Sequence, residues 1–366
     1  MLPIGMVRAQ AFTIPTDGPE ADGTASWDST TLIVVHAKAG DWEGVGYSYA
    51  DPSVAALVNS KLASVVAGND ASDPPRVWRL MQTAVRNLGG AGIAACAISA
   101  VDTALWDLKA KLLDVPLAHL LGRYRNAVPI YGSGGFTSYD NGRPAEQLAG
   151  WVEQDGCRWV KMKVGTHPEQ DPERVARAKA AIGPATLFVD ANGAYGVKQA
   201  AELARRFVDE QNVTWFEEPV SSDDLVGLCR VRDQVPPAIE IAAGEHGYEP
   251  TYFRRMLEAG AVDVLQADAT RCGGVTGFML AASLSEAFHV DLSAHCAPAL
   301  HRHLGTAAPR FRHCEWFHDH VRIERMLFDG APMPHDGMIT PDPERPGFGL
   351  VFKAKDAERF AVDTGS

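Results

Sequence analysis

Side chains suited to acid–base chemistry and metal binding recur along the second half of this 366-residue chain. They stand at nearly even intervals of about 23 to 29 residues, as expected of a repeated strand-plus-helix unit with one functional residue at each strand end. In chain order they are Lys161 with Lys163, Asp190, Glu217, Glu245, Asp268 and His295. In a (β/α)8 barrel the carboxyl ends of the strands meet at one mouth, so distant residues become neighbours around one substrate. The spacing therefore predicts an enzyme.

Three of these residues are carboxylates that end successive short apolar segments: Asp190, Glu217 and Glu245. Taken singly, each could be a helix cap or half of a surface ion pair. Brought together, the three would repel one another unless a divalent cation neutralised them. Because all the ligands are oxygens, the pattern predicts a hard ion, most simply Mg²⁺, with positions left open for water and substrate.

Lys161 and Lys163 are separated by one residue, so on a strand both side chains point to the same face. Each ammonium disfavours protonation of the other, and burial acts in the same direction. We therefore expect one lysine to have a lowered pKa and to act as a base. The alternative is an exposed strand with two solubilising lysines, which the buried strands of a barrel disfavour.

Asp268 and His295 complete the ring on the other side of the barrel. A carboxylate hydrogen-bonded to an imidazole fixes its tautomer and raises its basicity, which predicts a second acid–base group opposite the lysines. A divalent cation between opposed bases can support removal of a proton α to a carboxylate, because positive charge stabilises the resulting enediolate.

Other histidines and cysteines offer weaker alternatives. The pairs His301/His303 and His318/His320 suggest zinc, but neither pair has a clear third ligand from its spacing. Cys296 and Cys314 have no predicted base at a defined interval, so packing is favoured over a nucleophilic role.

The elements that must position these residues follow two patterns. Strands at 7–14 and 31–38, joined by a mobile loop at 15–29, are expected to precede helices at 51–67, 75–88 and 94–113. From residue 127, short apolar segments alternate with helical ones such as 197–209 and 252–259, which predicts a barrel. The eight expected barrel strands are 127–131, 158–163, 186–190, 213–217, 239–243, 262–266, 290–293 and 312–315. The tail after about 325 is expected to be irregular and to return to the first domain.

Charge and composition restrict the partners. The 46 acidic residues outnumber the 34 basic ones, and the net charge of −12 would repel nucleic acid. Residues 1–10 lack an export signal, and the most apolar stretch, 89–108, contains Asp102 and Asp107, so no membrane contact is expected. The six cysteines are dispersed without a CxxC pair, which favours reduced thiols. We therefore expect a cytoplasmic protein.

Nearly the whole chain resembles the enolase superfamily, in its mandelate racemase/muconate lactonizing enzyme family and specifically the mandelate racemase-like branch. The motifs that carry this resemblance are Ala97–Lys111 with Pro116-Leu and Leu120-Leu-Gly, then Lys161-Met-Lys163, Val189-Asp-Ala-Asn, Phe216-Glu-Glu-Pro, Gly244-Glu, Arg271-Cys-Gly-Gly-Val-Thr and His295. It implies a modified TIM barrel at 126–325 with an α+β capping domain at 1–125, to which the segment 326–366 returns. One departure is Gln266-Ala-Asp268, where many relatives carry proline just before the aspartate.

The resemblance also implies roles for single residues. Asp190, Glu217 and Glu245 would bind Mg²⁺, Lys163 would be a base, and Lys161 would hold the substrate carboxylate. Asp268 and His295 would form the opposing dyad. The remaining assignments are Glu315 as a hydrogen-bond partner of the substrate carboxylate, with a solvent-facing acid as the alternative, and Asn192 as a contact to substrate or metal-bound water.

Substrate choice in this family lies with capping-domain loops, here near 16–25 and 47–51. Their polar composition favours a hydroxylated substrate, and Asp17, Glu20 and Tyr47 are the candidate contacts. We therefore expect dehydration of a sugar acid to a 2-keto-3-deoxy acid, with the small-molecule carboxylate as ligand and a homo-oligomeric protein. The alternatives are a racemase or epimerase acting by 1,1-proton transfer, and a barrel that binds an acid sugar without catalysis.

Overall fold

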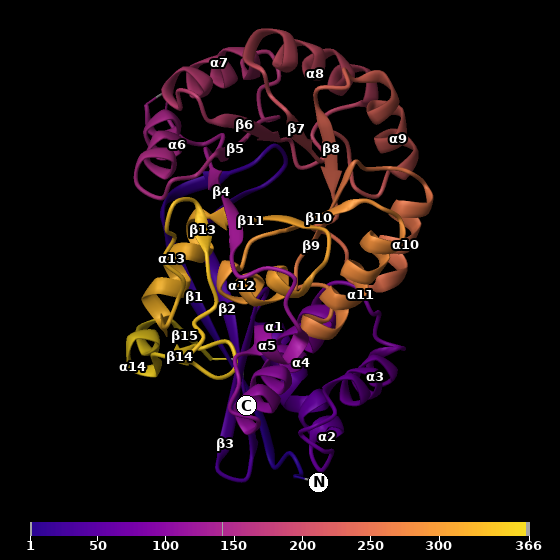
Figure 1. The fold of residues 1–366 in the computed structure, drawn as a ribbon, viewed down its shortest axis with the longest axis vertical. Helices are drawn as coiled ribbons and strands as arrows, with labels where there is room; N and C mark the ends of the chain where they lie inside the picture. Colours follow the sequence, from indigo (N-terminus) through magenta and orange to yellow (C-terminus); the bar gives the residue numbers. More distant parts are fainter. Residues whose placement is uncertain (1, 141, 364–366) are drawn as a thin grey trace.

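The computed structural model describes residues 2–140 and 142–363. Within them, eight parallel strands form a closed barrel (Figure 1). Each strand pairs with the next one along the chain, and the parallel pairing of β11 with β4 closes the ring. The strands are β4 (Val128–Gly134), β5 (Trp159–Lys163), β6 (Thr186–Asp190), β7 (Trp215–Glu217), β8 (Glu240–Ala243), β9 (Val264–Ala267), β10 (Asp291–Ala294) and β11 (Phe311–Phe317). The eight strands expected from the sequence are confirmed, with bounds that differ by a few residues.

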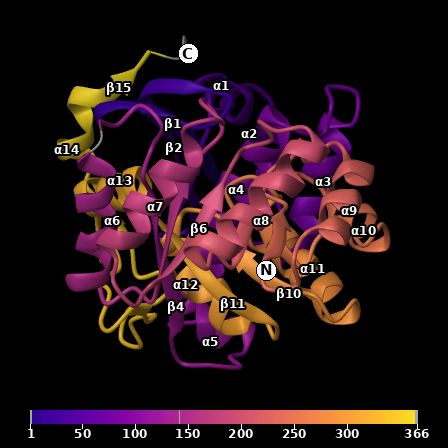
Figure 2. The same ribbon diagram turned by 90° about the horizontal axis from the view of Figure 1, so that it is seen from above.

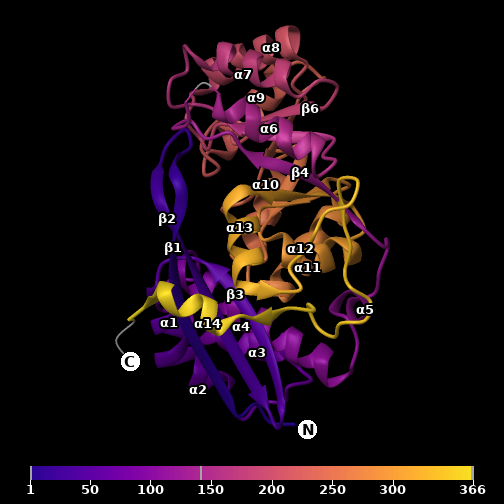
Figure 3. The same cartoon turned by 90° about the vertical axis from the view of Figure 1, so that its left-hand side faces the viewer.

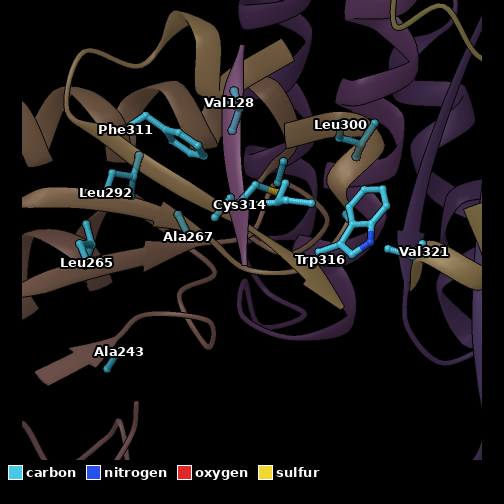
Figure 4. Packing of buried hydrophobic residues seen from close by; sticks show 14 of the residues in the cluster. Val128, Ala243, Leu265, Ala267, Leu292, Leu300, Phe311, Cys314, Trp316 and Val321 are labelled. Carbon is cyan, nitrogen blue, oxygen red and sulfur yellow. The ribbon is translucent and has the colours of Figure 1, made fainter. Parts of the chain in front are cut away.

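A helix follows each barrel strand and packs on the outside of the ring (Figures 1 and 2). These helices are α6 (Arg143–Glu153), α7 (Asp171–Ala181), α8 (Val197–Gln211), α9 (Leu225–Gln234), α10 (Pro250–Glu258), α11 (Gly274–Ala287), α12 (Pro298–Ala307) and α13 (His318–Leu327). Outward-facing strand residues such as Leu265 and Leu292 belong to one apolar core together with Leu300 of α12 (Figure 4). The helices expected at 197–209 and 252–259 are confirmed as α8 and α10.

The inside of the barrel is filled by a second, smaller apolar layer that includes Phe188 of β6 and Trp215 of β7, which stack with ring centroids 5.1 Å apart. Residues two apart on a strand point to the same side. Asp190 and Glu217, two residues after these aromatics, therefore also face the barrel axis, one step closer to the mouth. The aromatic layer closes the barrel beneath the polar residues.

An antiparallel sheet caps the barrel, in the order β15 (Ala361–Val362), β1 (Met6–Ala21), β2 (Ser26–Ala39) and β3 (Trp42–Tyr49). The expectation of a mobile loop at 15–29 is wrong, because β1 and β2 continue through most of it as a hairpin that reaches toward the barrel helices (Figure 3). The polar residues of this segment make cross-strand contacts, such as the hydrogen bond that Trp27 Nε1 donates to Glu20 Oε2 (2.9 Å). Strand β3 was not anticipated.

Helices on one side of the capping sheet complete its core. They are α1 (Ser53–Leu57), the π-helical η1 (Val58–Leu62), α2 (Ala63–Val66), α3 (Pro74–Val85) and α4 (Ile93–Leu112), followed by α5 (Leu117–Leu121). Glycines at 44 and 46 allow α4 to lie directly on β3, since a Cβ at either position would meet a backbone oxygen of α4 within 2.3 Å. The three helices expected from the sequence are confirmed here. Among the described residues, no helix is both long and apolar enough to cross a membrane.

The C-terminal segment runs back along the molecule. It contains β12 (Phe328–Asp329), β13 (Met338–Ile339), β14 (Val351–Phe352), α14 (Ala354–Ala357), the 3-10 turn η2 (Glu358–Phe360) and β15. Strand β13 pairs with β4 of the barrel, and β15 pairs with β1 of the capping sheet. The expected return to the N-terminal part is thus observed, whereas domain limits at 125 and 325 stay a prediction.

Candidate active site

The three acidic residues meet at the mouth of the barrel. Asp190 and Glu217 are the last residues of β6 and β7, and Glu245 follows β8 by two residues. All three are buried, and each offers a carboxylate oxygen within 4.8 Å of the others. Their convergence confirms the geometry that the interval pattern predicted.

This trio fits a hard dication. Burial and the negative charge of Asp190 raise the pKa of Glu217 well above its usual range, because both disfavour a second negative charge at this place. Glu245 Oε2 is buried and has no hydrogen-bond partner. An unpartnered buried oxygen in an all-oxygen donor set is what a Mg²⁺ ligand needs, because the ion takes the place of the missing partner.

Lys161 and Lys163 of β5 lie on one side of this trio. Lys163 Nζ is 2.6 Å from Asp190 Oδ2 and 3.1 Å from Asn192 Oδ1. Burial and the charge of Lys161 act to lower the pKa of Lys163, as expected from the sequence, but the negative charge of Asp190 outweighs them and the net pKa is raised. The reversal has a simple cause: the lysine faces carboxylates whose charge a bound cation would offset.

Asp268 and His295, the first residues after β9 and β10, lie on the opposite side. His295 Nδ1 is 2.8 Å from Asp268 Oδ2, and the ring's other nitrogen, Nε2, is 3.5 Å from Glu245 Oε2. Burial opposes ionisation of Asp268, but the hydrogen bond with His295 and the charge of Arg271 keep its pKa below the usual range. The ionised aspartate thus orients the imidazole so that Nε2 faces the trio.

Glu315 of β11 lies between the two sides. Its Oε1 is 2.8 Å from Lys161 Nζ and accepts a hydrogen bond from Ser133 Oγ at 2.6 Å, while Oε2 accepts one from the backbone amide of Cys296 at 2.9 Å. It is 1% exposed, which contradicts the alternative of a solvent-facing acid. Burial raises its pKa, but Lys161 and His295 more than offset this effect and hold it low.

A cavity of about 610 Å³ opens above these residues. Lys163, Asn192, Glu245 and His295 form its floor. Its walls include residues that were not expected to contact substrate: Asp22, Thr24, Trp27, Thr30, Tyr49, Asp51, His246, Arg271, Cys296, Phe317 and His320. The walls come partly from the two expected loop regions, so polar composition identified the segments although not the side chains.

Three candidate substrate contacts lie elsewhere among the described residues. Asp17 pairs with Arg143 at 2.7 Å and with His318 at 3.0 Å, and Glu20 is buried against Trp27. Tyr47 is buried and donates a hydrogen bond to Glu324. Tyr49 points to the same face of β3 two residues later and reaches the cavity. Because the two tyrosines lie on the same face of the strand, alternation along the strand cannot tell which of them lines the cavity. The position of β3 along the barrel decides that it is Tyr49.

The remaining histidine pairs have structural partners. His301 Nε2 accepts from the amide of Ala269 and its Nδ1 lies 2.8 Å from Cys296 O, while His303 is near the carbonyl of Phe348. His320 stacks on Tyr49 at a ring-centroid distance of 3.5 Å. These contacts hold the three histidines within the protein fold.

Comparison with known proteins gives a consistent picture. Residues 143–357 match the family described as "Enolase C-terminal domain-like", and residues 10–122 match "Mandelate racemase / muconate lactonizing enzyme, N-terminal domain". The chain is 32% identical to the 3,6-anhydro-alpha-L-galactonate cycloisomerase of Streptomyces coelicolor, over 98% of this chain and 99% of that protein. It is 31% identical to the L-talarate/galactarate dehydratase of Salmonella typhimurium, over 91% and 84%.

Two crystal structures resemble the whole fold. A mandelate racemase/muconate lactonizing enzyme-like protein from Rubrobacter xylanophilus is 50% identical, with a TM-score of 0.96 over 98% of this chain and 99% of that one. A racemase from Streptomyces coelicolor with bound magnesium is 30% identical, with a TM-score of 0.92 over 98% and 100%. Both domains of the family are matched, in the family's order, and the barrel mouth carries the acidic and basic residues described above. The chain therefore belongs to the mandelate racemase/muconate lactonizing enzyme family of the enolase superfamily.

Proposed function

We propose that this enzyme uses Mg²⁺ to remove the α-proton of a hydroxycarboxylate and then to eliminate the β-hydroxyl, which converts a sugar acid into a 2-keto-3-deoxy acid. The dehydratase and cycloisomerase activities of its relatives support this reaction class. The observation that carries the proposal is the pair of opposed acid–base groups. Lys163 Nζ lies beside Asp190, and His295 Nε2 lies beside Glu245 on the other side of the acidic trio.

Asp190, Glu217 and Glu245 are proposed to hold Mg²⁺, which supplies positive charge next to the substrate carboxylate when bound. Lys161 and Glu315 are proposed to position that carboxylate. Burial acts to lower the pKa of Lys161, but the negative charges of Glu217 and Glu315 raise it by more. The net pKa is raised, and the side chain stays cationic. A fixed ammonium at this place favours the enediolate over the ground state, because charge builds up on the carboxylate oxygens as the proton leaves.

The proton transfers use the two opposed groups. Lys163 Nζ or His295 Nε2 takes the α-proton, depending on the configuration of the substrate, and the C–H electron pair moves into the carboxylate. The C–O bond to the β-hydroxyl then breaks, and a proton on His295 Nε2 leaves with the hydroxyl as water. That proton is the one just taken from Cα when His295 is the base, and one already carried by the imidazolium when Lys163 is the base. The resulting enol tautomerises to the 2-keto-3-deoxy acid. Asp268 does not transfer a proton; it orients His295.

The test is a screen of acid sugars for 2-keto-3-deoxy product with Mg²⁺ present and again after chelation. We expect turnover with Mg²⁺, none after chelation, and recovery when Mg²⁺ is restored. Lys163→Ala should lower kcat by about 10²- to 10⁴-fold, as is typical when a general base is lost. Lys198→Ala, at an exposed position on α8, is the matched control and should leave kcat unchanged. Full turnover by Lys163→Ala of a substrate whose α-proton faces Lys163, with the metal still bound, contradicts the mechanism.

Racemisation or epimerisation is the second candidate, because acid–base groups on both sides also permit 1,1-proton transfer. It predicts that solvent deuterium enters at Cα without loss of water. Measuring deuterium content and keto-acid product on the same substrates separates the two reactions.

A small-molecule carboxylate is the proposed ligand. A homo-oligomer, the absence of nucleic-acid and membrane partners, and a cytoplasmic location stay predictions from the sequence. So does substrate contact by Asp17, Glu20 and Tyr47.

A further inference from the structure

Three different donor atoms converge beside the dyad. Cys296 Sγ is 3.3 Å from His295 Nε2 and 3.4 Å from Glu315 Oε2, and these nitrogen and oxygen atoms are 3.8 Å apart. All three residues are at least nine-tenths buried. They form a separate group of possible metal ligands that shares no residue with the acidic trio.

The spacing of these atoms suits a tetrahedral zinc ion. Zinc binds sulfur at about 2.3 Å and nitrogen or oxygen at about 2.0–2.2 Å, so neighbouring ligands of one ion are about 3.4–3.6 Å apart. The three observed separations lie within a few tenths of an ångström of that range. A thiol, an imidazole and a carboxylate are also a donor set that favours zinc over magnesium, because Mg²⁺ prefers oxygen alone.

The chain brings two consecutive side chains to the same carboxylate, which a regular strand does not do because adjacent residues point to opposite faces. Strand β10 ends at Ala294, and the backbone then turns through the left-handed region at Cys296 (φ 51°) and Ala297 (φ 40°). The Cys296 amide is held by Glu315 Oε2 in this turn. The cysteine side chain therefore lies beside its neighbour His295 and lines the cavity.

The other contacts of the group leave the donors usable. Lys161 and Ser133 contact Oε1 of Glu315, so Oε2 faces the cysteine and the histidine. Asp268 contacts Nδ1 of His295, so Nε2 is left to face Cys296 Sγ on one side and Glu245 Oε2 of the acidic trio on the other. A fourth ligand, such as water, can enter from the cavity, because His295 and Cys296 both line it.

We propose that His295, Cys296 and Glu315 form a second metal site, which binds Zn²⁺ and thereby blocks the enzyme. Binding releases the thiol proton to solvent, and the thiolate and carboxylate together neutralise the ion. Zinc is inhibitory because it occupies His295 Nε2, the atom that exchanges a proton with substrate. Zinc binding is independent of the proposed function, whereas inhibition rests on it.

The binding test uses the Mg²⁺-saturated enzyme with Co²⁺ as a spectroscopic substitute for zinc. Cys229, the partly buried cysteine, is first replaced by serine to remove background binding. We expect one equivalent of Co²⁺ to give a thiolate-to-metal charge-transfer band that Zn²⁺ then abolishes. No band, or a band that survives the loss of Cys296, overturns the site.

Two variants remove the thiol in different ways. Cys296→Ser keeps the size of the side chain, and Cys296→Gly suits the left-handed backbone, so failure of one variant to fold does not decide the test. Both should lose the band. Cys314→Ser is the matched control, because Cys314 is also buried on the neighbouring strand but packs in the apolar core with Leu300 and Phe311 (Figure 4). It should keep the band.

The activity test compares each protein with its own zinc-free rate. The Zn²⁺ concentration for half-inhibition should rise by about tenfold or more in Cys296→Ser. Loss of a residue that only hydrogen-bonds to a metal ligand already changes metal affinity by about 10- to 100-fold, and Cys296 is proposed to be a ligand itself. Equal zinc sensitivity of the parent and Cys296→Ser contradicts the proposal. A cysteine-dependent cobalt band in a protein that turns over no acid sugar would support the zinc site and reject the proposed function. Turnover of an acid sugar by a protein that shows no cobalt band would support the proposed function and reject the zinc site.

Discussion

At the scale of single residues, the function depends on how Asp268 presents His295. Asp268 Oδ2 contacts His295 Nδ1, while its Oδ1 accepts from the amide and hydroxyl of Thr270 at 2.7 and 2.8 Å. With both oxygens engaged, the carboxylate cannot rotate freely. An ionised acceptor at this position keeps the proton on Nδ1, which leaves the Nε2 lone pair available to act as a base.

Replacement of Asp268 by asparagine tests this tautomer argument. An amide nitrogen facing Nδ1 would donate to it and place the ring proton on Nε2, so kcat should fall by about 10²- to 10⁴-fold while KM changes little. Steady-state kinetics measure both quantities. Asp291→Asn, at the start of β10 where Asp291 pairs with Arg310 and Arg312, is the control and should keep its kcat. Unchanged kcat in Asp268→Asn would show that the dyad has no catalytic function.

At the scale of elements, the β1–β2 hairpin closes the cavity. The backbone oxygen of Asp22 accepts hydrogen bonds from the hydroxyls of Thr137 (2.9 Å) and Thr166 (2.7 Å), which lie on the loops after β4 and β5. Thr24 contacts the loop after β6 through Asn192 O at 3.3 Å. The hairpin extends from the capping sheet to the barrel (Figure 3). Its tip therefore rests on three successive barrel loops and forms one wall of the site.

The close approach at Gly23 allows a sharp test of this docking. A Cβ at Gly23 would lie 2.4 Å from Ala191 O and 2.7 Å from Val164 O, so Gly23→Ala should push the tip off the barrel. Overpacking of about 1–3 kcal/mol corresponds to a rise in KM of roughly 5- to 150-fold. Mg²⁺ affinity, measured by calorimetry, should not change. Gly196→Ala has open space and a negative φ of −85°, so it should behave as the parent. An unaltered KM in Gly23→Ala would mean that the hairpin does not hold substrate.

At the scale of the whole molecule, buried polar contacts join the capping sheet to the barrel. Tyr47 of β3 donates to Glu324 Oε1 of α13 at 2.5 Å, and Glu324 Oε2 accepts from the amide of Ala299 at 3.1 Å. Burial raises the pKa of Glu324 to about 8. The folded protein therefore holds this carboxyl protonated at pH values where the unfolded chain has already ionised it.

This difference predicts how stability depends on pH. Because the pKa is raised in the folded state, the contribution of Glu324 is full below its ordinary pKa of 4.5 and falls as the pH rises toward about 8. The slope is about 1.4 kcal/mol of unfolding free energy per pH unit in that window. Glu324→Gln does not ionise; its oxygen can accept from the Ala299 amide, and its amide nitrogen can donate to the Tyr47 hydroxyl. It should therefore reduce the decline in denaturant titrations at pH 5 to 8 by this amount. Glu344→Gln, at an exposed site, should keep it. An identical slope in Glu324→Gln and parent would contradict the raised pKa.

The sequence alone determined the barrel and the set of residues at its mouth. Asp190, Glu217 and Asp268 could be assigned to strand ends because a strand-plus-helix unit has a nearly constant length. The intervals between these residues in the sequence reflect that length. The same periodicity placed Lys163 and His295 on opposite sides of the trio. These are local properties, since each unit's pattern of apolar and polar residues indicates where its own strand lies.

Only the tertiary structure decided which side chains touch across elements. It selected Tyr49 over Tyr47 as a cavity wall, made a hairpin of residues expected to form a loop, and reversed the expected pKa direction of Lys163. It also brought Cys296 against His295 and Glu315. Each result depends on the position of one element along another or on a left-handed turn after a strand. The contacts of Tyr49, Lys163 and Glu315 join residues distant in sequence, and no local pattern of residues encodes their distances.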